Sequence, residues 1–300
     1  MTDPSPGSLR TAPSQPLVLS VVVALCGAAW GVFWYPMRGF EAAGVGGGWV
    51  SFVFNLVAIL TPLPFLLRRS AWRGFAGQLP TGLLLGSAFT LYTVSLVLTD
   101  VLNAILLFYL TPVWSTLGGR LFLGHALTAN RIAAILLGLA GMAFILGADG
   151  GLPLPRNAGD LIALVSGLLW SAGTLRSYAA PHPGIAQPVF AFSLGGLVSS
   201  SIVLLAGLAI ASPLIHTGAI LSVLPSMILI ALVMYVPPNF IILWASQRID
   251  PGRVGILLMT EVLVGAVSAA ILSGEPFGVP QIAGTVLIVG AGLVEVLGRR

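Results

Sequence analysis

The sequence contains no lysine and few charged residues of either sign. Charged residues make up 7% of its 300 residues, whereas hydrophobic residues make up 57%. An average soluble domain is about 25% charged, and a soluble fold of this length could not cover its surface with so few charges. The composition therefore predicts a polytopic membrane protein. Without lysine there is also no Walker-type phosphate loop, so we do not expect ATP to drive the protein directly.

Cysteine and histidine are also scarce. Cys26 is the single cysteine, and His125, His182 and His216 all fall between the long apolar runs. One cysteine excludes an intrachain disulfide, and no cluster of residues has the spacing of metal ligands. A membrane hydrolase would need a general base beside its nucleophile within the spans. The sequence therefore predicts a protein that is not an enzyme and has no cofactor. A lipid-modifying transferase is a disfavoured alternative.

Long apolar runs take up most of the chain. A membrane-spanning helix needs about 20 mostly apolar residues. Ten runs meet this length: 17–35, 48–67, 79–98, 101–122, 129–148, 158–179, 187–210, 223–246, 253–273 and 279–297. We therefore expect an all-α fold of ten transmembrane helices, preceded by a disordered cytoplasmic tail over residues 1–16.

The arginines predict the orientation of these helices. All thirteen basic residues are arginine, and eleven of them fall on the side that holds both termini. Only Arg38 and Arg156 fall on the other side. Because cytoplasmic loops carry the excess of basic residues, we expect both termini in the cytoplasm. The net charge of +4 includes no basic run that would bind nucleic acid.

The two halves of the sequence are similar to each other. Gly27-Ala-Ala-Trp30 is similar to Gly167-Leu-Leu-Trp170, and residues 103–112 are similar to residues 253–262. Each half holds five predicted spans, an odd number, so the second half must be inverted relative to the first. We expect one five-helix repeat over 17–148 and its inverted counterpart over 158–297. Inverted repeats are typical of secondary transporters, because two equivalent halves allow inward-open and outward-open states.

On these features the chain resembles the drug/metabolite transporter superfamily, EamA type. The Gly-x-x-Trp sequence near the start of each half supports the resemblance, and the aromatic run Trp30-Gly-Val-Phe-Trp-Tyr35 makes the chain most similar to the YddG-type amino-acid exporters of bacteria. The resemblance implies ten helices around a central cavity, location in a bacterial inner membrane, and export of amino acids or similar metabolites. The chain departs from the usual Glu-Pro of spans four and nine, with Thr111-Pro112 and Glu261-Val262 in their place.

Polar and aromatic residues inside the spans are the candidate substrate-binding residues, because such groups are costly in hydrocarbon. Glu261 lies well inside span nine and could bind a substrate amine or a proton; the alternative is a structural carboxyl group. Trp30 and Trp170 occupy equivalent positions in the two halves. Tyr92 and Tyr109 lie away from the interfacial belts where tyrosine is usual. For these four, the alternative is a packed core aromatic residue.

A pair of prolines marks span eight, in Tyr235-Val-Pro-Pro-Asn239. Two prolines remove two backbone donors and predict a break in the helix. Tyr235 and Asn239 are four residues apart and would share one face. We therefore expect a binding element here, with a kink needed only for packing as the alternative.

The inverted repeat predicts a secondary transporter, and the resemblance implies that it exports amino acids, including aromatic ones, and other neutral or zwitterionic metabolites. No arginine lies deep in a span, which disfavours phosphorylated cargo. A lipid flippase or an exporter of hydrophobic drugs is the alternative, and a scaffold without transport would need no inverted repeat. We expect a monomer that contacts a small-molecule substrate and membrane lipid, with the proton as the candidate coupling ion.

Overall fold

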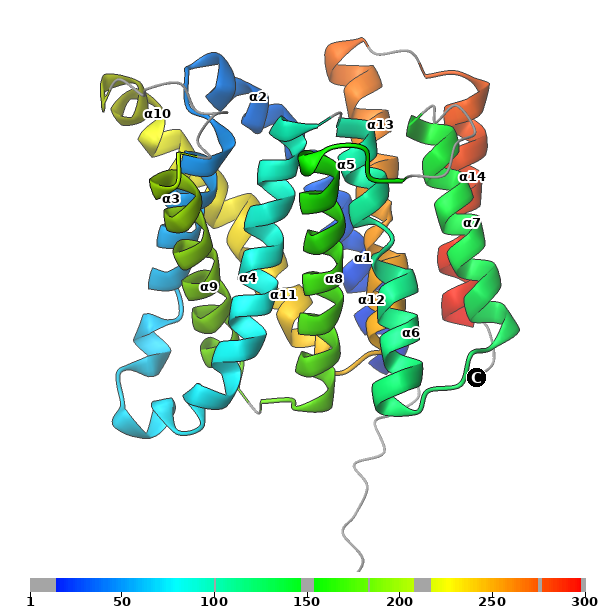
Figure 1. The fold of residues 1–300 in the computed structure, drawn as a ribbon, viewed down its shortest axis with the longest axis horizontal. Coiled ribbons are helices and arrows are strands. Elements are labelled where there is room, and N and C mark those ends of the chain that lie inside the picture. Colours follow the sequence, from blue (N-terminus) through cyan, green and yellow to red (C-terminus); the bar gives the residue numbers. More distant parts are fainter. Residues whose placement is uncertain are drawn as a thin grey trace, which may run out of the picture.

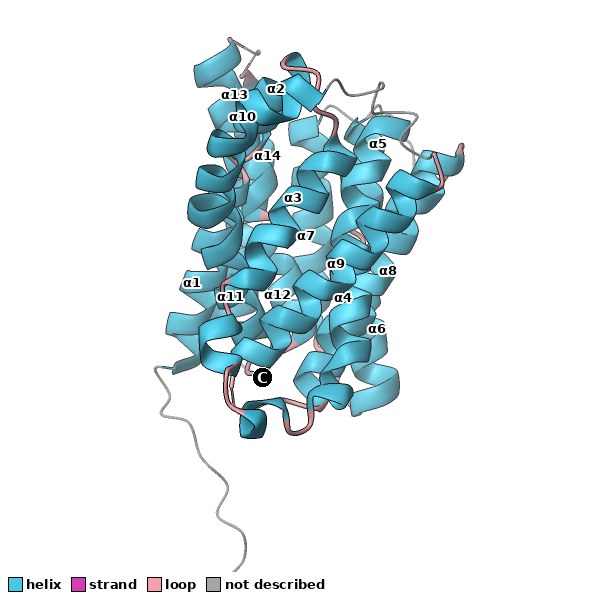
Figure 2. Ribbon diagram, turned by 90° about the vertical axis from the view of Figure 1, so that its left-hand side faces the viewer, coloured by secondary structure: helices cyan, strands magenta, loops and turns pink. Residues whose placement is uncertain are grey.

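The computed structural model describes residues 15–99, 101–146, 154–182, 184–207, 217–274 and 277–297. In these residues every element is a helix, and the helices run side by side in one bundle (Figures 1 and 2). Among the described residues, nine helical segments are long and apolar enough to span a bilayer, and Gly47–Leu60 is a shorter apolar helix. The predicted fold class is confirmed. Residues 1–14 of the predicted tail and His216 lie outside the described residues.

Each half of the chain contributes five crossings of the bundle. The first five are α1 (Gln15–Trp30) with α2 (Trp34–Ala42), α3 (Gly47–Leu60), α4 (Phe75–Leu98), α5 (Val101–Phe108) with α6 (Thr111–Leu123), and α7 (Ala129–Leu146). The other five are α8 (Ala158–Ala179), α9 (Ala186–Leu205), α10 (Thr217–Ile230) with η4 (Ala231–Tyr235) and α11 (Val236–Ser246), α12 (Pro251–Leu258) with α13 (Thr260–Ser273), and α14 (Val279–Leu297). The short helices η1 (Leu63–Leu66) and η2 (Arg69–Trp72) join α3 to α4.

The start of α1 and the end of α14 lie at the same end of the bundle (Figure 1), which we name the terminal face. Helix α2 lies at the other end, the opposite face. Five crossings separate the start of α1 from the start of α8, so the second half begins at the opposite face. The two halves therefore run through the bundle in inverted directions.

Two spans are broken at corresponding positions of the two halves. Tyr109 and Leu110 separate α5 from α6, and Met259, 150 residues after Tyr109, separates α12 from α13. The sequence predicted a single span in each place. In the first half the cause is Pro112, which has no N–H for the Phe108 carbonyl. The Thr111 hydroxyl donates to that carbonyl instead, at 2.5 Å.

Glycines allow helices to approach closely at two contacts. A Cβ atom at Gly86 of α4 would lie 2.3 Å from the carbonyl oxygen of Phe192 in α9. A Cβ atom at Gly141 of α7 would lie 2.7 Å from the carbonyl oxygen of Gly284 in α14. Both separations are too short for a real methyl group, so these glycines hold α4 against α9 and α7 against α14, as small residues do at membrane helix contacts.

Candidate functional site

A cavity of about 580 Å³ lies in the centre of the bundle. Its lining extends from Trp30 and Trp170, deep in the bundle, to Arg38 and Glu41 on α2 at the opposite face. Pockets for small molecules usually measure about 300–1,000 Å³ and are mostly apolar. The cavity therefore has a suitable size for a metabolite, and its mouth residues belong to one face of the bundle.

Five of the seven predicted site residues line this cavity: Trp30, Tyr92, Tyr109, Trp170 and Glu261. They come from α1, from α4, from the break between α5 and α6, from α8 and from α13. The fold thus brings side chains from both halves of the sequence together around one cavity.

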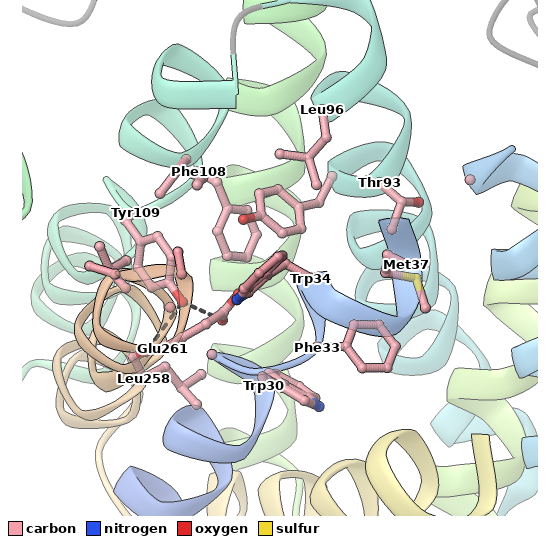
Figure 3. A pocket seen from close by; sticks show the side chains of 18 of the residues that line it. Trp30, Phe33, Trp34, Met37, Thr93, Leu96, Phe108, Tyr109, Leu258 and Glu261 are labelled. Carbon is pink, nitrogen blue, oxygen red and sulfur yellow. Dashed lines mark hydrogen bonds between the residues drawn. The ribbon is translucent and has the colours of Figure 1, made fainter. Parts of the chain in front are cut away.

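Tyr109 and Glu261 point toward each other at the cavity (Figure 3). The Tyr109 hydroxyl donates to Glu261 Oε2 at 2.5 Å and lies 3.2 Å from the Leu258 carbonyl oxygen. That carbonyl lies at the break in the span, where the Val262 N–H donates to the Met259 carbonyl at 3.1 Å. The helix break therefore supplies the phenol with a second acceptor.

This geometry accommodates both charge states of Glu261. A phenol has one proton to donate and can also accept. With Glu261 ionised, Tyr109 donates to the carboxylate. With Glu261 protonated, the carboxyl group can donate to Tyr109, whose hydroxyl then donates to the Leu258 carbonyl. The pair can thus hold or release a proton without leaving either group unpaired.

Aromatic rings form much of the cavity wall. The rings of Tyr92 and Phe108 lie 4.3 Å apart between centroids, and Phe108 also contacts Trp170 at 6.4 Å. Trp30 contacts Phe89 at 6.2 Å. These rings provide a surface for an apolar or aromatic part of a ligand and can also attract a cation to their faces.

Four other aromatic residues of the cavity lining were not among the predicted site residues: Phe33, Trp34, Phe89 and Phe108. The Trp34 indole N–H donates to Ser268 Oγ at 2.9 Å, which ties α2 to α13. The signal available in the sequence was the aromatic run that continues from Trp30 to Trp34, with Phe89 three residues before Tyr92 and Phe108 directly before Tyr109.

The cavity lining does not include Tyr235 and Asn239. Tyr235 is fully buried, and its hydroxyl donates to Asn55 Oδ1 at 3.1 Å. Asn239 Nδ2 donates to the Tyr235 carbonyl at 2.8 Å. The chain also stays helical here, because the π-helical turn η4 leads into α11 and absorbs the irregularity. Tyr235 packs behind Phe89, with 5.2 Å between ring centroids, and supports the wall from outside.

Charged groups from both halves meet at the terminal face. Asp250 accepts from Arg131 Nη1 at 2.6 Å, and its other oxygen lies 2.7 Å from His125 Nδ1. Arg131 also donates to both oxygens of Glu295 at 2.8 Å. Asp250 caps α12 by accepting from the N–H groups of the next turn. Burial acts to raise the pKa of Asp250, but the Arg131 guanidinium and these hydrogen bonds hold that pKa below its ordinary value.

Neutral hydrogen bonds connect elements of the second half at the same face. The hydroxyls of Ser177 and Ser246 lie 3.2 Å apart, between α8 and α11. The His182 N–H donates to Gln247 Oε1 at 2.7 Å. Together with the charged cluster, these contacts hold the terminal face together, whereas the cavity extends toward the opposite face. In the described part of the chain, no group of three or more Asp, Glu, His or Cys side chains is arranged to hold a metal ion.

Comparisons with known proteins agree with this architecture. No curated protein matches the chain. A protein of known crystal structure has the same fold, with a TM-score of 0.73 and 18% identity over 95% of this chain and 98% of the other. Residues 18–147 and 157–295 each match the EamA-like transporter family, one match for each five-helix half. The chain therefore belongs to the EamA-like transporter family, and is a membrane transporter of the drug/metabolite type.

Proposed function

We propose that the protein is a secondary transporter that exports amino acids, including aromatic ones, and similar neutral or zwitterionic metabolites across a bacterial inner membrane. The observation that carries this proposal is the Tyr109–Glu261 pair at an aromatic-walled cavity. A carboxylate is the natural partner of a substrate ammonium group, and aromatic walls suit the apolar side chain.

The cargo would bind with its ammonium group near Glu261 and its side chain against Trp30, Tyr92 and Trp170. Tyr109 would keep Glu261 oriented and would take part in exchanging a proton for the ammonium group. Tyr235 and Asn239 would contribute indirectly, since they support the wall through Phe89 and lie outside the cavity lining.

Alternating access would expose this site to each side in turn. The arginine-rich terminal face fits the cytoplasmic side, so the cavity extends toward the outside. Opening to the cytoplasm would require the halves to separate at the terminal face, where Arg131, Asp250 and Glu295 now connect them. Inverted repeats supply this second state by exchanging the conformations of the two halves.

Flux into liposomes tests the proposal. We expect the purified protein, as a monomer, to transport at least one labelled amino acid with saturable kinetics. We also expect a proton gradient of the correct sign to accelerate that flux. Absence of saturable flux for a panel of the twenty amino acids would contradict the proposed cargo.

A second candidate cargo is a lipid or a hydrophobic drug, because much of the lining is apolar, with Phe33, Phe89, Leu96 and Phe108 among its members. Competition separates the two candidates. Free amino acids should block the flux of an amino acid through a shared site, whereas a lipid carrier should be unaffected by millimolar amino acids.

A further inference from the structure

We infer that the deep part of the cavity recognises an ammonium group and not a carboxylate, so that the protein also carries amines that have an aromatic or apolar body and no carboxylate. This inference rests on the proposed function, since it concerns the same cavity. It extends that function to a second class of substrate, the organic monoamines.

Fixed charges are distributed unevenly along the cavity. Among the described lining residues, the acidic or basic ones other than tyrosine are Arg38, Glu41 and Glu261. Arg38 and Glu41 lie on α2 at the mouth, and Glu261 lies in the first turn of α13. The charged group beside the deep aromatic walls is therefore an acid, and the basic group is at the mouth.

The distance between the two charged positions follows from helix geometry. The Arg38 guanidinium lies 4.9 Å above the Trp34 ring, and the Trp34 N–H donates to Ser268. Ser268 follows Glu261 by seven residues in the continuous helix α13, a rise of about 10 Å. Arg38 thus lies beside Trp34, which contacts α13 at Ser268, about two helical turns from Glu261.

An α-amino acid cannot bridge that separation. Its ammonium and carboxylate groups are attached to the same carbon atom, so a molecule whose ammonium contacts Glu261 cannot place its carboxylate on Arg38. The nearby Tyr109 hydroxyl already donates to Glu261. A substrate carboxylate would therefore lie close to a like charge with no fixed cation to compensate it, an arrangement that costs free energy in a site of low dielectric constant.

The aromatic rings strengthen the preference for a cation. Phe108 lies against Tyr92 at 4.3 Å and against Tyr109 at 5.3 Å between centroids, so rings surround the same region as the carboxylate. The faces of aromatic rings attract ammonium groups and not anions. Amino acids would then be carried because of their ammonium group, with their carboxylate directed toward the wider, mouth side of the cavity.

Three ligands with one side chain test this inference on the wild-type protein: phenylalanine, phenethylamine, which lacks the carboxylate, and 3-phenylpropionate, which lacks the ammonium group. Titration calorimetry with the purified protein measures each affinity. We expect phenethylamine to bind at least as tightly as phenylalanine, and 3-phenylpropionate to bind at least about 10-fold more weakly than phenethylamine. Equal binding of amine and acid, or binding of phenylalanine without binding of phenethylamine, would overturn the inference.

Two carboxylate substitutions locate the selectivity. Glu261→Gln keeps the side-chain size and an acceptor for Tyr109 but removes the charge, and we expect it to abolish the preference for phenethylamine over 3-phenylpropionate. Glu41→Gln makes the same change at the mouth, and we expect the preference to remain. Loss of the preference in Glu41→Gln but not in Glu261→Gln would contradict the assignment. If Glu261→Gln does not fold, the wild-type ligand series and Glu41→Gln decide the question.

Failure of the inference and failure of the proposed cargo give different results. Saturable amino-acid flux that 3-phenylpropionate inhibits as well as phenethylamine would leave the proposed export intact and refute amine recognition. Flux of phenethylamine without flux of any amino acid would refute amino-acid export and support amine recognition.

Discussion

Tyr109 and Glu261 are 152 residues apart in the sequence and form a 2.5 Å hydrogen bond in the structure. Tyr109 lies at the helix break in the fourth span, and Glu261 follows the corresponding break in the ninth span by two residues. The inverted repeat thus places its two equivalent breaks together, and the residue types that differ between them, a phenol and a carboxylic acid, form the polar centre of the cavity.

Replacing Tyr109 with phenylalanine tests the role of this hydrogen bond. Loss of the hydroxyl leaves Glu261 and the Leu258 carbonyl without their donor, and we expect transport to fall about 10-fold. The melting temperature should change by only a few degrees, since one hydrogen bond contributes about 1 kcal/mol. Flux and thermal unfolding of the purified variant are the measurements. Tyr35→Phe is the matched control, because Tyr35 is 55% exposed and is not part of the cavity lining, and its flux should stay at the wild-type level.

Proton coupling is expected to depend on Glu261. In proteoliposomes with an imposed pH gradient, wild-type flux should rise with the gradient, because Glu261 can release a proton when it binds an ammonium group. Glu261→Gln cannot exchange a proton, and its residual flux should be the same with and without the gradient. A variant that still responds fully to the gradient would show that the proton is carried elsewhere.

The sequence was sufficient to predict the ten spans, their inversion and five of the cavity residues. Apolar runs and the 150-residue spacing are properties of the chain itself, and Glu261 is conspicuous as an acid within an apolar run. The break at Met259 was not predictable, since the local sequence has no proline and the freed Leu258 carbonyl finds its partner in Tyr109 from the other half.

Two other features depended on tertiary structure. Trp34 reaches the cavity because the chain turns between Trp30 and Trp34 before it continues as α2, whereas the sequence predicted one helix through this region. Tyr235 and Asn239 do share a helix, but their polar atoms are taken by Asn55 and by the Tyr235 backbone. Sequence spacing shows which residues share a face, but not what that face contacts.

Close packing of α4 on α9 should be sensitive to a single methyl group. We expect Gly86→Ala to lower the free energy of unfolding by about 1–3 kcal/mol, because the added Cβ atom would overlap the Phe192 carbonyl. The melting temperature should fall accordingly. Gly77→Ala is the control in the same helix, since a Cβ atom there meets no atom within 4 Å. Equal melting temperatures for the two variants would show that α4 and α9 are not in this close contact.

The stability of the folded protein should depend on pH through the charge of the Asp250 carboxylate. Its pKa is lower in the folded protein than in the unfolded chain, so it contributes stability above the ordinary Asp pKa of about 3.9. That contribution is lost as the pH falls from there through the lower folded pKa. We expect Asp250→Asn, which retains the ability to cap α12, to melt below the wild type at pH 7. The difference in melting temperature between the two proteins should narrow below about pH 4. A gap that is constant down to pH 3 would show that the charge is not its source.

Alternating access is the central claim, and the accessibility of Thr93 tests it most directly. Thr93 lines the cavity, and Cys26 is the single cysteine, so Thr93→Cys in a Cys26→Ser background gives one reactive thiol. A membrane-impermeant maleimide should label it from the opposite face in the absence of cargo, and from the terminal face as well when a cargo gradient drives turnover. Labelling from the opposite face alone under every condition, or from neither face, would contradict the account.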